Sequence, residues 1–112
     1  MPRLVGKGKA LELLLTGKTI TSSEAYSLGV VEKVFDDDLL LKECYLLANK
    51  ISKNAPIAIL NTIKSVDKGY NEDIDSALNR EAKLFSDLFN TDDAKNGMNS
   101  FINKEKSTFK GK

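Results

Sequence analysis

The sequence has 112 residues, of which 41% are hydrophobic and 29% charged, and its formal net charge is +1. These values are typical of one soluble globular domain and exclude disordered, collagen-like and disulfide-stapled classes. The near-neutral charge does not suggest a nucleic-acid binder, and no apolar stretch approaches the roughly 20 residues of a membrane span. Cys44, the only cysteine, is expected to be a small core residue of a protein in a reducing compartment, which indicates a cytoplasmic location.

Two helices and one extended segment are predicted in the first third of the chain. Apolar residues at spacings of three and four predict a helix over 7–16, and Gly17 is expected to end it in the left-handed conformation. Thr21 and Glu24 have the spacing of a capping box, which predicts a short helix through Leu28 that Gly29 closes. Residues 29–35, GVVEKVF, form the one period-2 stretch rich in β-branched residues and predict a short extended segment.

The rest of the chain has helical periodicity throughout. Three aspartates at 36–38 precede a helix that continues to Ile51, and Pro56 begins the next helix, which ends at Gly69. A further helix is predicted from Asp73 through Phe89, and a last one from Thr91 to about Lys106. The chain is therefore predicted to be all-α, with about six helices and one short extended segment.

Several kinds of catalytic or metal site are excluded. The chain contains no histidine, which removes His-dependent triads and imidazole acid–base chemistry. The aspartates at 36–38 could suggest a cation site, but acids are common at helix starts, and we interpret these residues as helix capping. We therefore predict no metal ligand and identify no catalytic residue.

Several short stretches, taken in order, resemble the C-terminal part of the enoyl-CoA hydratase (crotonase) family. They are PRLVG at 2–6, ELLLTG at 12–17, Ile20, EA at 24–25, LGVV at 28–31, Glu81, Phe85, TDD at 91–93, GM at 97–98, Phe101, Lys104 and Phe109. The resemblance covers nearly all of the chain. It implies that residues 1–112 are a single helical segment, the C-terminal part of the α/β crotonase spiral fold.

The same resemblance implies that the chemistry lies elsewhere. In the family, the paired glutamates and the backbone amides of the oxyanion hole precede the Pro2-Arg3-Leu4 stretch. We therefore expect this chain to lack the N-terminal catalytic spiral domain. We expect it to be a truncated, internally started or excised product. We expect the isolated chain to be inactive.

Two residues near the C-terminus carry the binding role that the resemblance implies. Phe101 matches an aromatic residue that packs on the adenine of coenzyme A, and Lys104 matches a lysine that meets its 3'-phosphate, in a neighbouring subunit. On a continuous helix the two residues would share one face, because they lie three positions apart. The alternative is that Phe101 belongs to the core and Lys104 is a solvated surface charge. Glu105 departs from the family pattern and places an acid beside the proposed phosphate contact.

The resemblance implies a C-terminal acyl-CoA-binding and oligomerisation segment of a short-chain enoyl-CoA hydratase, a lyase of fatty-acid metabolism. The substrate would be carried as a coenzyme A thioester, and no separate cofactor is implied. The expected partners are acyl-CoA, the N-terminal half of the same fold, and further copies in a trimer or dimer of trimers. Two alternatives stay open: a non-catalytic helical interaction module, and the same segment of an enoyl-CoA isomerase or acyl-CoA hydrolase.

Overall fold

The computed structural model describes residues 1–112 and contains seven helices and no strand. Its residues divide into two compact units, Met1–Cys44 and Tyr45–Lys112. The predicted all-α class is confirmed. None of the helices is both long enough and apolar enough to cross a membrane.

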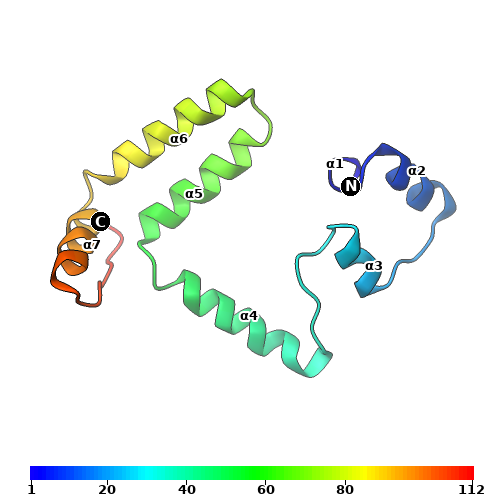
Figure 1. Ribbon diagram of the computed structural model, residues 1–112, viewed down its shortest axis with the longest axis horizontal. Helices are drawn as coiled ribbons and strands as arrows, with labels where there is room; N and C mark the ends of the chain where they lie inside the picture. Colours follow the sequence, from blue (N-terminus) through cyan, green and yellow to red (C-terminus); the bar gives the residue numbers. More distant parts are fainter. The chain divides into compact units, whose positions relative to one another are not determined.

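The first unit contains three short helices and the beginning of a fourth. Helix α1 (Pro2–Val5) packs against α2 (Lys7–Thr16), and α3 (Ser22–Ser27) follows after a short connection (Figure 1). Helix α1 is absent from the sequence-based prediction because four residues are too few to show a period. Ala10 and Leu13 of α2 are the two buried apolar residues of the chain.

The predicted helix stops in this unit are confirmed. Gly17 ends α2 with φ of 62° and ψ of 22°, in the left-handed region that glycine adopts without steric cost. After α3, the amide of Gly29 donates to the carbonyl of Tyr26, and that of Val30 donates to the carbonyl of Ala25. This pair of hydrogen bonds is a Schellman motif, a common way for a helix to end at a glycine.

The extended segment predicted over 29–35 does not form a strand. Bends occupy residues 30–32, and the amide of Val31 also donates to the carbonyl of Ala25. A strand requires a second strand as a partner for its backbone groups, and this chain has none. The period-2 pattern therefore does not produce a strand here.

Four longer helices complete the chain: α4 (Asp37–Ile51), α5 (Pro56–Gly69), α6 (Ile74–Leu88) and α7 (Asp92–Asn103). Helices α5 and α6 lie side by side as a hairpin joined by residues 70–73 (Figure 1). The two helices approach closely at one end, where a Cβ on Gly69 would lie 3.3 Å from the Cβ of Ala77. Pro56 and the capping residue Asp73 begin their helices as predicted.

The apolar stripes that predict the longer helices are largely uncovered. Cys44, expected in the core, is exposed. Large apolar side chains that remain exposed on these stripes include Leu40, Leu47, Ile51, Ile63, Val66, Ile74, Leu78, Phe85 and Phe89. The helices therefore present apolar faces that the residues of this chain do not bury.

Candidate functional site

Helix α7 and the tail that follows it carry both candidate binding residues. Thr91 caps the helix, because its hydroxyl oxygen accepts from the amide of Ala94 at 3.1 Å. This confirms the start predicted from the sequence. Phe101, near the other end of the helix, is 86% exposed.

Helix α7 ends at Asn103, earlier than the predicted end near Lys106. Lys104 has φ of 57° and ψ of 37° and is the only non-glycine residue with a positive φ. The amide of Lys104 donates to the carbonyl of Phe101 at 3.3 Å, and that of Glu105 donates to the carbonyl of Ser100 at 2.8 Å. These bonds form a second Schellman motif, here without the usual glycine. The missing glycine explains why the sequence did not predict this end.

The early helix end corrects the predicted arrangement of Phe101 and Lys104. Lys104 does not lie on a continuous helix three residues after Phe101, because the chain turns at Lys104 itself. Glu105 also lies outside the helix. Both residues are exposed beyond the end of α7.

A buried carboxylate holds the tail against the start of the same helix. The side chain of Asp93 accepts from the amides of Lys110 and Gly111, each at 2.7 Å. The amide of Asp93 donates to the carbonyl of Lys112 at 3.0 Å. Figure 1 shows the tail returning along α7 toward its first turn. This contact is not predictable from the sequence, because an aspartate in a TDD stretch resembles ordinary helix capping and no local signal identifies a partner 17 residues away.

An apolar cavity of about 270 Å³ lies beside Asp93 and the tail that it holds. Its walls come from the beginning of α5, the end of α6, the first half of α7 and the tail. The tail contributes Phe109, and the end of α6 contributes Phe85 and Phe89, whose rings meet edge to face at 5.3 Å. The cavity can hold an apolar group, because most of the side chains that line it are apolar.

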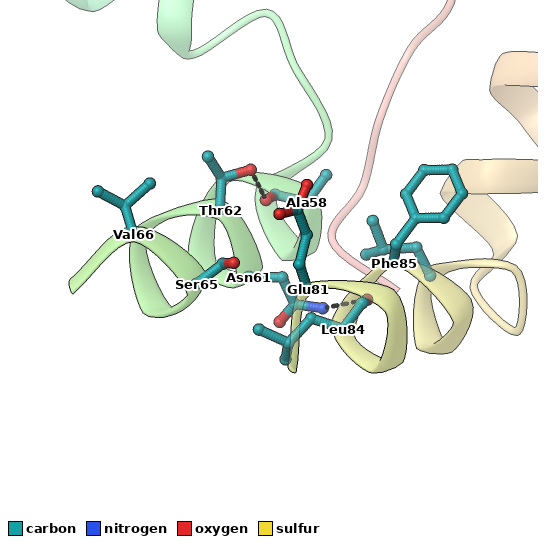
Figure 2. Close-up of a pocket in the computed structure, with 9 residues that line it drawn as sticks. Ala58, Asn61, Thr62, Ser65, Val66, Glu81, Leu84 and Phe85 are labelled. Carbon is teal, nitrogen blue, oxygen red and sulfur yellow. Dashed lines mark hydrogen bonds between the residues drawn. The ribbon is translucent and has the colours of Figure 1, made fainter. Parts of the chain in front are cut away.

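A second, more polar cavity of about 220 Å³ lies between α5 and α6. Figure 2 shows Asn61, Ser65 and Glu81 among its walls. The side-chain amide of Asn61 donates to the backbone carbonyl of Leu84 at 3.1 Å, and so links the two helices. The other polar side chains that line this cavity are Thr62, Ser65 and Glu81.

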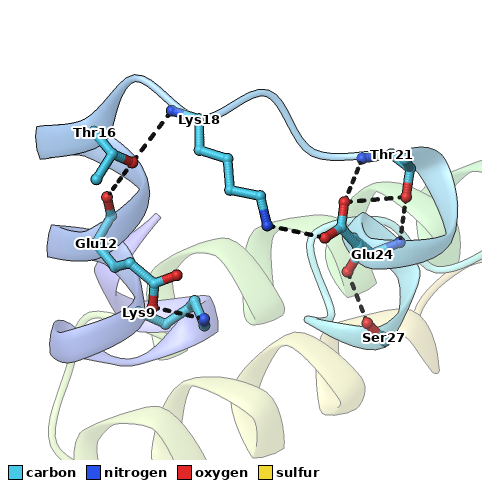
Figure 3. Close-up of polar contacts among 7 residues, drawn as sticks. All are labelled: Lys9, Glu12, Thr16, Lys18, Thr21, Glu24 and Ser27. Carbon is cyan, nitrogen blue, oxygen red and sulfur yellow. Dashed lines mark hydrogen bonds and ion pairs between the residues drawn. The ribbon is translucent and has the colours of Figure 1, made fainter.

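The most connected group of polar side chains lies in the first unit and serves to cap a helix. Glu24 accepts from the amide of Thr21 at 2.9 Å, while the Thr21 hydroxyl accepts from the amide of Glu24 at 3.1 Å (Figure 3). This is the predicted capping box. The hydrogen bond from the Thr21 amide, followed by the contact with Lys18, lowers the pKa of Glu24.

Hydrogen bonds also lower the pKa of two other acids. The hydrogen bond from Lys9 lowers the pKa of Glu12, and the amide of Ser76 lowers that of Asp73. No group of three or more His, Cys, Asp or Glu side chains is gathered for a metal ion, and the aspartates at 36–38 form no such group.

Taken together, the chain is a helical segment with uncovered apolar faces and with an exposed phenylalanine and lysine at the end of α7. Comparison with solved structures places this segment in a known fold. The chain matches the enoyl-CoA hydratase of Bacillus anthracis with a TM-score of 0.93 at 33% identity, over 99% of this chain and 43% of that one. It therefore has the fold of the helical part of crotonase-type enzymes.

Sequence comparisons give the same family. A profile described as Enoyl-CoA hydratase/isomerase matches residues 1–112. The short-chain-enoyl-CoA hydratase of Clostridium acetobutylicum is 39% identical over 106 residues, which are 95% of this chain and 41% of that protein. The crotonyl-CoA hydratase of Syntrophomonas wolfei is 38% identical over 97% of this chain and 42% of its own length. The chain belongs to the enoyl-CoA hydratase/isomerase family, and it spans about two fifths of the length of these two relatives.

Proposed function

We propose that this chain is the acyl-CoA-binding and assembly segment of a short-chain enoyl-CoA hydratase. The observation that carries the proposal is the match of nearly the whole chain to proteins named short-chain-enoyl-CoA hydratase and crotonyl-CoA hydratase. The reaction would be the reversible addition of water across the 2,3-double bond of an acyl-CoA thioester. Coenzyme A is then part of the substrate, and no separate cofactor takes part.

The proposed division of labour leaves the chemical step outside this chain. Water addition forms a C–O bond at carbon 3 and a C–H bond at carbon 2, and the thioester oxygen carries negative charge in between. Preorganised amides stabilise such an oxyanion, and paired carboxyls move the protons. The family resemblance assigns both to the N-terminal part of the fold. We therefore assign no catalytic role to residues 1–112.

The proposed binding contacts are Phe101 and Lys104. Phe101 offers an uncovered ring for stacking on adenine, and 86% of its surface is exposed. Lys104 offers an ammonium group that is free of the helix and exposed, as a contact with the 3'-phosphate requires. Glu105 follows a turn at Lys104, so its carboxylate need not face the same phosphate. These contacts would be made to the coenzyme A of a neighbouring subunit.

The uncovered apolar faces support the assembly role. Partners would be the N-terminal half of the fold and further copies in a trimer or dimer of trimers. The same faces also support the second candidate, a non-catalytic helical interaction module, because such a module would likewise need apolar surface for its partner. The lone cysteine supports placing the protein in the cytoplasm, a reducing compartment.

A chimera separates the two candidates. Residues 1–112 would replace the matching 41% of the Clostridium acetobutylicum relative, and the hydration of crotonyl-CoA would be measured. A hydratase segment should restore turnover in the chimera, whereas the isolated chain should show none. A chimera that folds but neither binds nor hydrates acyl-CoA would favour the non-catalytic interaction module. An isolated chain that hydrates crotonyl-CoA after repurification would contradict the proposed division of labour.

A further inference from the structure

Asp93 is the one charged side chain that the fold buries, with 1% of its surface exposed. Its neighbour Asp92, one residue earlier in the same first turn, has a side chain that is 64% exposed and lies 3.7 Å from Lys95. Burying a carboxylate is costly unless hydrogen bonds replace its water. The two acids therefore have different roles, although they are adjacent and of the same type.

Backbone groups of the tail replace the water that Asp93 loses. Each carboxylate oxygen accepts one tail amide, from Lys110 and from Gly111, at 2.7 Å. The carbonyl of Lys112 accepts the Asp93 amide, which is one of the donors left free at a helix N-terminus. The positive end of the helix dipole adds favourable charge at this position. Three hydrogen bonds thus join the last three residues to the first turn of α7.

The latched tail reaches two other parts of the same unit. A Cβ on Gly97 would lie 3.4 Å from Cε1 of Phe109, so the Phe109 ring rests against the middle of α7. A Cβ on Gly111 would lie 3.5 Å from the side chain of Pro56, the first residue of α5. The tail therefore crosses from α7 to the start of α5 and forms one wall of the apolar cavity.

The same latch fixes the far end of the loop that carries Lys104. The loop begins at the left-handed turn of Lys104, where hydrogen bonds to Ser100 and Phe101 hold it. It ends at Lys110, where Asp93 holds it. Because both ends are fixed, the positions open to Lys104 depend on the Asp93 contacts as well as on the helix end.

We infer that residues 104–112 form a strap that Asp93 latches, and that Asp93 is a positioning residue for the coenzyme A contact of Lys104. This inference rests on the proposed function. Asp93 itself touches no substrate: it acts by holding the strap, and the strap holds the Lys104 loop in one arrangement before the ligand binds. A preorganised loop loses less conformational freedom on binding, so the released strap should bind the 3'-phosphate less tightly.

The strap is tested first by amide exchange in the full chain. Asp93→Asn keeps the size of the side chain but replaces one acceptor oxygen with a donor, so one tail amide loses its partner. Exchange at Lys110 or Gly111 should accelerate about 10- to 100-fold, the loss expected for a hydrogen bond to a charged group. Asp92→Asn is the matched control and should leave these amides unchanged. A second variant that ends at Phe109 removes the latched residues while Asp93 is kept.

The positioning role is tested by the ratio of affinities for coenzyme A and dephospho-coenzyme A. Partial unfolding lowers both affinities together, so the ratio reports the phosphate contact alone. Asp93→Asn and the shortened chain should both lower the ratio toward one, and Asp92→Asn should not. If the tail amides exchange faster in Asp93→Asn but the affinity ratio is unchanged, the positioning role of Asp93 is overturned. The proposed function still stands in that case if Lys104→Ala lowers the ratio. If the amides of Lys110 and Gly111 exchange equally fast in Asp93→Asn and in the unchanged chain, Asp93 does not hold the strap. If Lys104→Ala leaves the ratio unchanged, the proposed contact between Lys104 and the 3'-phosphate is wrong, and so is the positioning role of Asp93. The amide-exchange data then still show whether Asp93 holds the strap.

Discussion

Asn61 in α5 donates a hydrogen bond from its side-chain amide to the backbone carbonyl of Leu84 in α6, at 3.1 Å. The bond crosses between the two helices and lies in a partly buried position (Figure 2). Because a hydrogen bond requires one alignment of donor and acceptor, it favours one register of the hairpin.

Replacing Asn61 with Ala should lower the free energy of unfolding of the α5–α6 hairpin by about 1 kcal/mol, the usual net value of one such hydrogen bond. Asn49→Ala, at an exposed position of α4, is the control, because both changes share the gain in helix propensity. Urea unfolding followed by circular dichroism measures the difference. Equal stability of the two variants would show that the interhelix bond contributes nothing.

The capping box of α3 should weaken in acid. The pKa of Glu24 is lowered in the folded chain, chiefly by the hydrogen bond from the Thr21 amide. Glu24 therefore stabilises the fold above the usual glutamate pKa, and this contribution is lost as the pH falls through the lowered pKa. Amide exchange of residues 22–27 across this pH range should show α3 opening first.

Glu24→Gln separates the cap from its charge. A glutamine can still accept from the Thr21 amide but does not titrate, so the acid-dependent opening of α3 should disappear. Glu32→Gln, an exposed acid outside the box, changes the net charge equally and should retain it. Identical pH profiles for the two variants would contradict the role of Glu24. Thr21→Ala should cost about 1 kcal/mol at neutral pH, as is typical of a lost N-cap.

In a full-length protein with this segment, Phe101→Ala and Lys104→Ala should each raise KM for acyl-CoA by roughly 5- to 10-fold. The turnover number should change little, because contacts remote from the reacting carbons act equally on the bound substrate and the transition state. Added salt should shrink the lysine effect and leave the phenylalanine effect. Dephospho-coenzyme A thioesters should be insensitive to Lys104→Ala.

Phe85→Ala is the comparison for the aromatic contact. Phe85 is also an exposed aromatic residue, at 62%, but it belongs to α6 and lines the apolar cavity with Phe89. A KM effect confined to Phe101→Ala would support stacking at the end of α7. If the effect falls on Phe85→Ala instead, the adenine contact belongs to α6 and the assignment of Phe101 is wrong.

The isolated chain should self-associate, because its uncovered apolar faces gain burial only from a second molecule. Sedimentation equilibrium over a wide concentration range should show species larger than the monomer. Changing both Phe85 and Phe89 to Ser should reduce the association, whereas Lys83→Gln on the same helix should not. A clean monomer that fails to bind a hydrophobic dye would rule out the expected association.

The local sequence by itself determined where most helices begin and end. The Thr21 capping box, the Asp73 and Thr91 caps and the Gly17 stop all use hydrogen bonds or backbone preferences within a few residues. Such interactions depend on neighbouring residue types alone, so their spacing in the sequence predicts them. The family resemblance likewise followed from ordered short stretches, and the profile match over the whole chain confirms it.

The tertiary structure alone decided which acid is buried and where the last helix ends. Asp92 and Asp93 are identical in type and adjacent, yet Asp93 binds a tail that is 17 residues away. Lys104 takes a left-handed conformation that its residue type disfavours. We attribute this to the tail, which must turn back at this point to reach the first turn of α7. Long-range contacts of this kind depend on how the whole unit packs, which no local spacing encodes.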